Sequence, residues 1–165
     1  MSTHGVNVVA AVNPPLPLPP CVDIDSGVRL GATGDLDSDG EIDIVTTCVD
    51  GGQSSADAFS ISFGNGDGSY DAPVVIDSNG AVRPLVVDVN ADDYPDILVA
   101  SDIDFGVAVF INDGAGAFAD PLALVIGEPV YSMAVGDIED DGAVDIVVPY
   151  DTPMGGRVAL FRADP

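Results

Sequence analysis

The chain has 165 residues, a length that suits one domain, and 47% of them are hydrophobic, so it can bury a core and is not a disordered acidic tail. Its 28 acidic residues face only 4 basic ones, all arginines, and the formal net charge is -24. Such a surface repels phosphate backbones and anionic lipid headgroups, which argues against nucleic-acid and membrane partners. Acidity without lysine is also typical of high-salt environments, where salt screens the self-repulsion.

Residues 1–20 are predicted to form an extended, proline-rich segment ahead of the folded part. Prolines interrupt the apolar stretch VNVVAAVNPPLPLPP, and no basic residue precedes Arg29. We therefore expect neither a signal peptide nor a membrane-spanning helix in this segment. Cys21 and Cys48 are either two buried thiols or a disulfide, and the sequence leaves both alternatives open.

The whole chain has 19 glycines and 13 prolines, and its apolar segments are rich in Val and Ile. From residue 21 onward this pattern favours short strands joined by turns. An acidic stretch occurs three times, as GDLDSDGEIDIV, VDVNADDYPDIL and GDIEDDGAVDIV, with first aspartates Asp35, Asp88 and Asp137. The copies are about 50 residues apart, the length of one four-stranded propeller blade.

The segments between the acidic stretches repeat as well. Each acidic stretch leads into a strand (DIVTTCV, DILVASD, DIVVPYD), a variable loop and a second strand (FSISFG, VAVFIN, VALFRA). In the first two repeats a glycine-rich turn follows, GNGDGSYDAP or NDGAGAFADP, whose Asn-Gly and Asp-Gly pairs accept positive φ. VVIDSNGAVRPLVV and LALVIGEPVYSMAV then supply an outer strand and the inner strand of the next unit, whereas the third repeat stops before this piece.

Over about residues 21–162 these units resemble FG-GAP or VCBS repeats, the calcium-binding blades of integrin-α-like propellers. The D-x-D-x-D-G-x-x-D loop and the FGNGDG…AP turn carry the resemblance. It implies an all-β, propeller-like array of about three four-stranded blades over residues 21–165, with calcium bound in the loops and with binding rather than catalysis as the activity. Asp93 departs from the pattern because Gly40 and Gly142 hold its place in the other loops, but Asp tolerates the left-handed conformation better than most residues.

Each acidic loop offers acceptors at positions 1, 3, 5 and 9 and a backbone carbonyl at position 7, which suits the roughly six to eight oxygen ligands of Ca²⁺. Mg²⁺ fits less well because it requires a smaller octahedral cage. The second loop has an amide in place of one carboxylate, so we expect it to bind most weakly. The predicted ligands of about three Ca²⁺ are Asp35, Asp37, Asp39, the Glu41 carbonyl and Asp43; Asp88, Asn90, Asp92, the Tyr94 carbonyl and Asp96; and Asp137, Glu139, Asp141, the Ala143 carbonyl and Asp145.

The sequence favours a non-enzymatic binding module. No nucleophilic set can be assembled around the lone histidine, His4, and without lysine there is no phosphate-binding P-loop. Carboxylate pairs suited to glycoside hydrolysis lie at calcium-loop spacing, so a polysaccharide-active enzyme is a remote alternative.

Variable loops 50–58, 101–106 and 150–157 occupy equivalent positions in the three repeats, so we expect them on one face of the molecule. There Phe105, Tyr150 and Arg157 would contact a glycan or protein ligand, in an extracellular adhesion role. The alternative for these residues is local packing and pairing with nearby carboxylates. The absence of Trp weakens a lectin assignment.

Closed propellers need about four to eight blades, more than the three repeats of this chain. The alternative function is therefore a structural subunit of a virion surface or extracellular filament. The N-terminal LPPCVDI aligns with an outer strand, and the third repeat lacks one. We expect subunits to exchange this strand and to assemble into a ring, with a dimer of six blades favoured, or into a filament.

Overall fold

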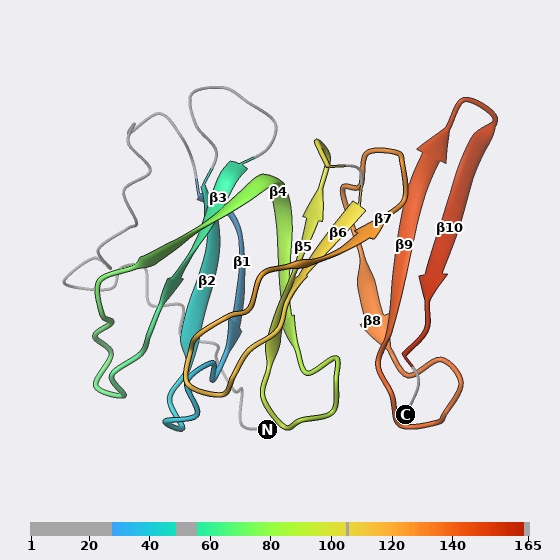
Figure 1. Cartoon of the computed structure of the whole chain (residues 1–165). Coiled ribbons are helices and arrows are strands. Elements are labelled where there is room, and N and C mark those ends of the chain that lie inside the picture. Colours follow the sequence, from blue (N-terminus) through green and yellow to red (C-terminus); the bar gives the residue numbers. More distant parts are fainter. Residues whose placement is uncertain (1–27, 49–55, 105, 164–165) are drawn as a thin grey trace, which may run out of the picture.

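The computed structural model describes residues 28–48, 56–104 and 106–163, and every regular element in these ranges is a β-strand (Figure 1). The strands are β1 (Val28–Gly34), β2 (Asp43–Cys48), β3 (Ala56–Ser62), β4 (Val74–Val87), β5 (Asp96–Ser101), β6 (Gly106–Phe110), β7 (Leu122–Val125), β8 (Ala134–Gly136), β9 (Asp145–Thr152) and β10 (Gly155–Phe161).

Neighbouring strands pair antiparallel in the order β1-β2-β3-β4-β5-β6-β7, and β10-β9-β8 form a separate sheet. Strand β4 serves two units, because residues 74–77 pair with β3 and residues 83–87 pair with β5. The long ladder is thus two four-stranded sheets that share one bent strand. Together with β8–β10 they form three repeated antiparallel units, so the all-β prediction is confirmed, including the continuous outer-to-inner strand.

The bend of β4 depends on Gly80. Its φ of 72° lies in the left-handed region, and a Cβ at this position would lie 2.8 Å from Cβ of Ile103. Glycine is therefore the residue that allows the chain to turn from the outer edge of one sheet to the inner strand of the next.

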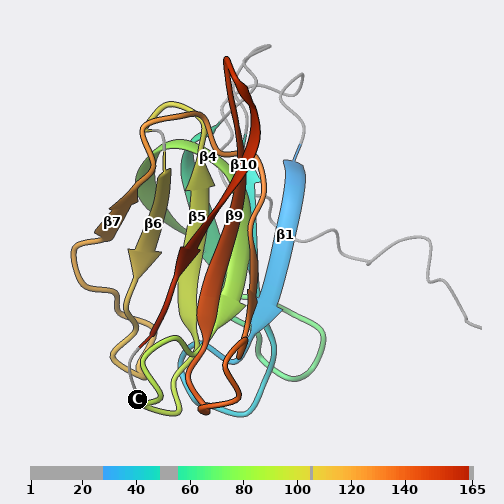
Figure 2. The same cartoon turned by 90° about the vertical axis from the view of Figure 1, so that its right-hand side faces the viewer.

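Two hydrophobic clusters lie between the three sheets, so the second sheet is buried on both faces. Strand β5 is buried at every residue, with Ile97 in the cluster shared with the first sheet and Leu98 in the cluster shared with the third. In the first cluster the rings of Phe59 and Phe110 meet edge to face, with centroids 5.0 Å apart. Figure 2 shows β9 and β10 in front of β4 and β5, as face-to-face packing requires.

The three acidic loops lie at one end of the sheets, and the β5–β6 and β9–β10 connections lie at the other (Figure 1). The predicted loop over residues 150–157 is wrong, because β9 extends to Thr152 and β10 begins at Gly155. The hydroxyl of Thr152 donates to the Gly155 carbonyl (2.9 Å) and accepts from the Met154 N–H (3.2 Å), which closes a tight hairpin turn.

Several predictions concern residues outside the described ranges. They are the proline-rich segment 1–20, the LPPCVDI strand, Phe105, most of the first variable loop and the pairing of Cys21 with Cys48. The vacant outer position in the third sheet is described: β10 pairs with β9 and with no other described strand.

Candidate metal centre

In each acidic loop, backbone N–H groups of the loop donate to the carboxylate of the first aspartate. Asp35 accepts hydrogen bonds from the N–H groups of Asp39 (3.1 Å) and Gly40 (3.0 Å). The same pair of bonds, from positions 5 and 6 of the loop, occurs in the other two copies. The equivalents are Asp92 N (3.3 Å) and Asp93 N (2.9 Å) to Asp88, and Asp141 N (3.1 Å) and Gly142 N (2.8 Å) to Asp137.

Two residues of each loop adopt left-handed backbone conformations. At position 6, φ is 89° for Gly40, 72° for Asp93 and 90° for Gly142, so Asp93 does adopt the conformation expected of it. At position 4 the left-handed residues are Ser38 (61°), Ala91 (59°) and Asp140 (60°), where no glycine signalled such a turn. The bonds to the lead carboxylate therefore fix a turn that local propensity alone does not specify.

The aspartates at position 9 are buried and hold the loops to the sheets. Asp43 is fully buried, and its two oxygens accept from the N–H groups of Leu36 (2.6 Å) and Gly64 (2.8 Å). Gly64 follows β3, so the carboxylate joins the loop to the start of the next turn. The equivalent bonds are Val89 N (3.0 Å) and Asn112 N (2.9 Å) to Asp96, and Ile138 N (3.0 Å) and Ala163 N (3.2 Å) to Asp145.

The sequence predicts these three residues as metal ligands, and the structure shows in addition that their oxygens accept backbone N–H groups, which ligand spacing does not predict. Burial raises the pKa of Asp43 and of Asp96 above its usual value, and neighbouring loop carboxylates raise it further, whereas the backbone N–H groups lower it. The sequence did hold a signal for this role, because each position-9 aspartate is the first residue of an apolar strand whose first residues contribute to the core.

The first loop gathers three carboxylates. One ligand oxygen from each of Asp35, Asp37 and Asp39 lies within 4.8 Å of the others. Among the described His, Cys, Asp and Glu residues, only this set of three is gathered so closely. Like charges at this separation repel, and a cation among them relieves the repulsion. Carboxylate oxygens are the ligands that Ca²⁺ prefers, so these residues fit the ion.

In the second loop an amide takes the middle place. Asn90 donates from Nδ2 to Oδ2 of Asp92 (2.8 Å), and its Oδ1 accepts from the Asp92 N–H (3.2 Å). Asn90 and Asp92 therefore hydrogen-bond to each other within the loop. The ring of Tyr94 lies over Gly114 of the glycine-rich turn, where a Cβ would meet ring carbons at 2.6 Å. The side chain at position 7 thus faces this turn, which leaves its carbonyl as the group available for a metal.

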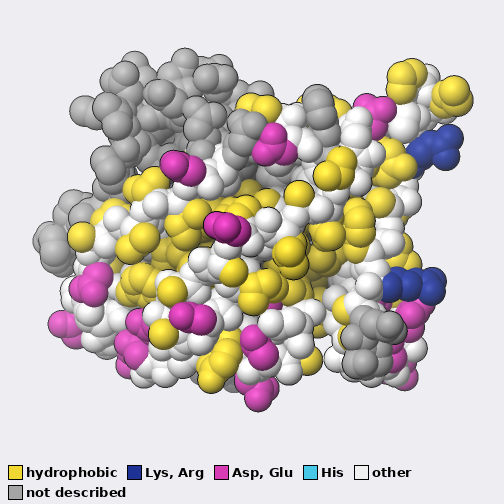
Figure 3. All heavy atoms as spheres, viewed as in Figure 1, with side chains coloured by type: hydrophobic (Ala, Val, Ile, Leu, Met, Phe, Trp, Pro, Cys, Tyr) yellow, Lys and Arg dark blue, Asp and Glu magenta, His cyan; other side chains and the backbone are white. Residues whose placement is uncertain are grey.

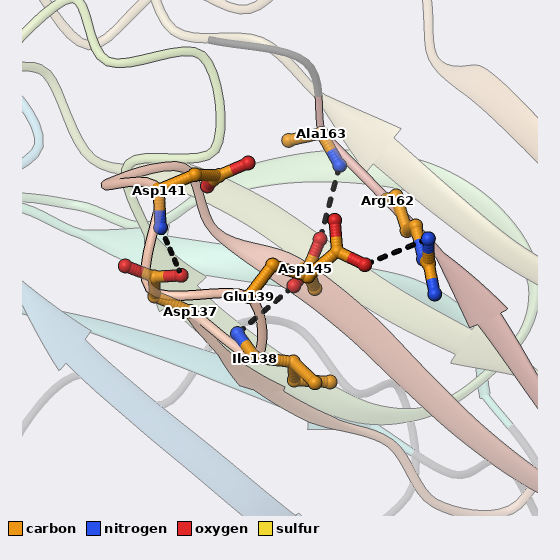
Figure 4. Close-up of polar contacts among 7 residues, drawn as sticks. All are labelled: Asp137, Ile138, Glu139, Asp141, Asp145, Arg162 and Ala163. Carbon is orange, nitrogen blue, oxygen red and sulfur yellow. Dashed lines mark hydrogen bonds and ion pairs between the residues drawn. The ribbon is translucent and has the colours of Figure 1, made fainter.

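The third loop differs from the other two because its position-3 side chain, Glu139, pairs with a residue outside the loop. Oε1 of Glu139 lies 2.7 Å from Nη1 of Arg162, the residue that follows β10. Figure 4 shows the Glu139 carboxylate turned toward Arg162 and away from the carboxylate of Asp137. The predicted ligands Asp137 and Asp141 therefore lie in a loop whose remaining predicted side-chain ligand at position 3, Glu139, forms an ion pair with Arg162 outside the loop.

Two of the three predicted recognition residues are brought together. Tyr150 and Arg157 face each other across the β9–β10 ladder and, with Tyr131 and Pro129, line a hollow of about 580 Å³. Phe105 lies outside the described ranges. The hairpin, rather than a flexible loop, therefore presents this pair.

A comparison with known protein families finds a similarity in the second half of the chain. Residues 88–148 match the model of the FG-GAP-like repeat family, so this part of the chain is similar to FG-GAP-like repeats. The matched segment runs from the lead aspartate of the second acidic loop into β9, and it includes most of the third loop's strand–loop–strand unit. A search of curated proteins found no match. In the described residues no helix is long and apolar enough to cross a membrane.

Proposed function

We propose that the chain is a non-enzymatic, calcium-stabilised β-propeller module for extracellular binding or adhesion. The observation that carries the proposal is that carboxylate oxygens of Asp35, Asp37 and Asp39 lie within 4.8 Å of one another. The sequence pattern of this loop occurs three times in the chain. An FG-GAP-like repeat fits a propeller blade and is typical of extracellular proteins, which supports both the fold and the location.

In this proposal Asp35, Asp37, Asp39 and the Glu41 carbonyl hold a calcium ion in the first loop. A bound ion supplies positive charge, which offsets the repulsion between carboxylates of a chain with a net charge of -24. The loop joins β1 to β2, so its closure would stabilise the inner edge of the first sheet, and metal binding would contribute to the folding free energy.

Ligand recognition is assigned to the hollow beside Tyr150 and Arg157. An aromatic ring, a guanidinium group and the exposed ring of Tyr131 line it, a combination that suits a glycan or protein surface. The acidic surface, visible along the lower edge of the molecule in Figure 3, argues against nucleic acid and membrane insertion.

A second candidate function is a structural subunit of a virion surface or an extracellular filament, including one from a high-salt environment. The observation that favours it is the outer edge of β10, which pairs with no other described strand. An open strand edge is a site for pairing with another chain.

The calcium proposal is tested by titrating chelator-treated protein with Ca²⁺ in a calorimeter and by measuring the melting temperature before and after. We expect heat of binding and a higher melting temperature. Asp37→Asn should weaken binding, whereas Asp120→Asn, an equal charge change at an exposed residue outside the acidic loops, should not. A melting temperature indifferent to Ca²⁺, with no heat, would refute the proposal.

A further inference from the structure

The third acidic loop is paired with a positively charged side chain of the same chain, that of Arg162. Arg162 comes directly before Ala163, whose N–H donates to Asp145. In the first two repeats the residues before the equivalent donors, Gly64 and Asn112, are Phe63 and Ile111. The arginine therefore stands where the other repeats have an apolar residue.

The partner of Arg162 is also particular to this repeat. Position 3 of the loop is Asp37 in the first repeat and Asn90 in the second, but Glu139 in the third. Glutamate is longer than aspartate by one methylene, and here its carboxylate reaches Nη1 of Arg162 at 2.7 Å. Both partners of the ion pair are thus substitutions found only in the third copy.

We propose that Arg162 is the built-in counter-cation of the third loop and competes with Ca²⁺ for Glu139, so that this loop binds Ca²⁺ more weakly than the first. The inference rests on the proposed calcium function. Ligand charge alone makes the first and third loops equal, because each offers four carboxylates, so the inference separates two loops that ligand charge does not distinguish.

Arg162 weakens calcium binding to the third loop but does not prevent it. The side chain of Arg162 is 62% exposed and that of Glu139 is 35% exposed, so water and salt screen their attraction. An exposed pair of this kind lowers a competing affinity by about two- to fivefold. Calcium that takes Glu139 also releases Arg162 from the loop, and by linkage any contact that draws Arg162 away strengthens calcium binding.

The experiment follows each loop by its own glycine in the full-length protein. The N–H of Gly40 donates to Asp35 in the first loop, and that of Gly142 donates to Asp137 in the third. Amide NMR signals of the two glycines, recorded during one Ca²⁺ titration, give separate midpoints for the two loops. In the wild type we expect the Gly142 midpoint at a higher Ca²⁺ concentration than the Gly40 midpoint.

Arg162→Gln should move the Gly142 midpoint to an about two- to fivefold lower Ca²⁺ concentration and leave Gly40 in place. Arg162→Lys keeps the charge and should stay near the wild type. The matched control is Arg83→Gln, which removes the same charge from an exposed residue of β4 and should move neither midpoint.

Each outcome separates this inference from the proposal on which it rests. If neither glycine responds to Ca²⁺ in the wild type, the proposed calcium function fails. If Gly40 responds but Arg162→Gln leaves Gly142 unchanged, or if Arg83→Gln shifts Gly142 equally, only the competition by Arg162 is refuted. A Gly142 response that appears only in Arg162→Gln would support it.

Discussion

At the scale of single residues, the aspartates of the first acidic loop differ in burial and in hydrogen bonding. Asp35, Asp37 and Asp39 are at least partly exposed and converge within 4.8 Å, as a cation site requires. Asp43 is fully buried, and both of its oxygens already accept backbone N–H groups. One pattern of alternating carboxylates therefore combines candidate ligands with a structural bond that needs no metal.

Asp43→Asn tests this division. The amide keeps the shape but places an NH₂ group against one of the two backbone donors, so a buried N–H loses its acceptor. We expect the free energy of unfolding to fall by about 1–3 kcal/mol, with or without Ca²⁺. The measurement is denaturant unfolding in chelator and in saturating Ca²⁺.

The comparison variant is Asp37→Asn, at a residue that is not buried. It should change the unfolding free energy little in chelator and should lose part of the calcium-dependent gain. Equal effects of both variants in chelator would contradict the division between ligand and structural aspartates.

At the scale of elements, the sequence predicted the strands, the glycine-rich turns and the continuity of β4, because these follow from local patterns. Gly66 and Gly114 have φ of 71° and 80°, as the Asn-Gly and Asp-Gly pairs predicted. The two strands around residues 150–157 were predicted, but the loop between them was drawn too long because Pro153 and two adjacent glycines are typical of a loop. The Thr152 hydroxyl, which closes the turn, overrides that signal.

The candidate site was predictable only in part for a physical reason. Ligand spacing within one loop is local, so the convergence in the first loop could be anticipated. The bonds from Gly64 to Asp43 and from Asn112 to Asp96 span 21 and 16 residues and depend on the register of the sheets. The direction of Glu139 likewise depends on where β10 ends, which no pattern within the loop specifies.

The bend in β4 gives a prediction at this scale. Gly80→Ala adds a Cβ at a φ of 72° and places it 2.8 Å from Cβ of Ile103, so both backbone strain and a steric clash oppose it. We expect the unfolding free energy to fall by about 1–3 kcal/mol, measured by denaturant unfolding.

The matched control for Gly80 is Gly136, in strand β8. A Cβ added there meets no atom within 4 Å, and its φ is not positive. Gly136→Ala should therefore change stability little. If the two substitutions cost the same, the bend does not depend on Gly80.

At the scale of the whole molecule, the third sheet lacks the outer strand that the other two have among the described residues. The second sheet is buried on both faces, whereas the third ends at β10, whose Val158 and Leu160 are 65% and 38% exposed. In the first two sheets the equivalent strands, β3 and β6, each pair with an outer strand. The third sheet therefore has a position that another strand of similar sequence fits.

We expect the intact chain to associate through this position, with a dimer as the leading form and a filament as the alternative. LPPCVDI aligns with the outer strands of the other units, and we expect the N-terminal segment of a second copy to supply the strand. Light scattering at micromolar concentration should give a mass above that of the 16.7 kDa monomer. Deletion of residues 1–24 should give monomers or aggregates.

A point substitution distinguishes strand pairing at the β10 edge from non-specific association. Val158→Lys places a charge on β10, and charges on edge strands oppose strand addition, so we expect the assembly to dissociate without loss of the fold. Val125→Lys makes the same change at a 70% exposed residue of β7, the outermost strand of the second sheet. Because the proposed exchange uses β10 alone, this variant should remain associated. A compact, stable monomer from the intact chain, or dissociation by both variants alike, would refute strand exchange at β10.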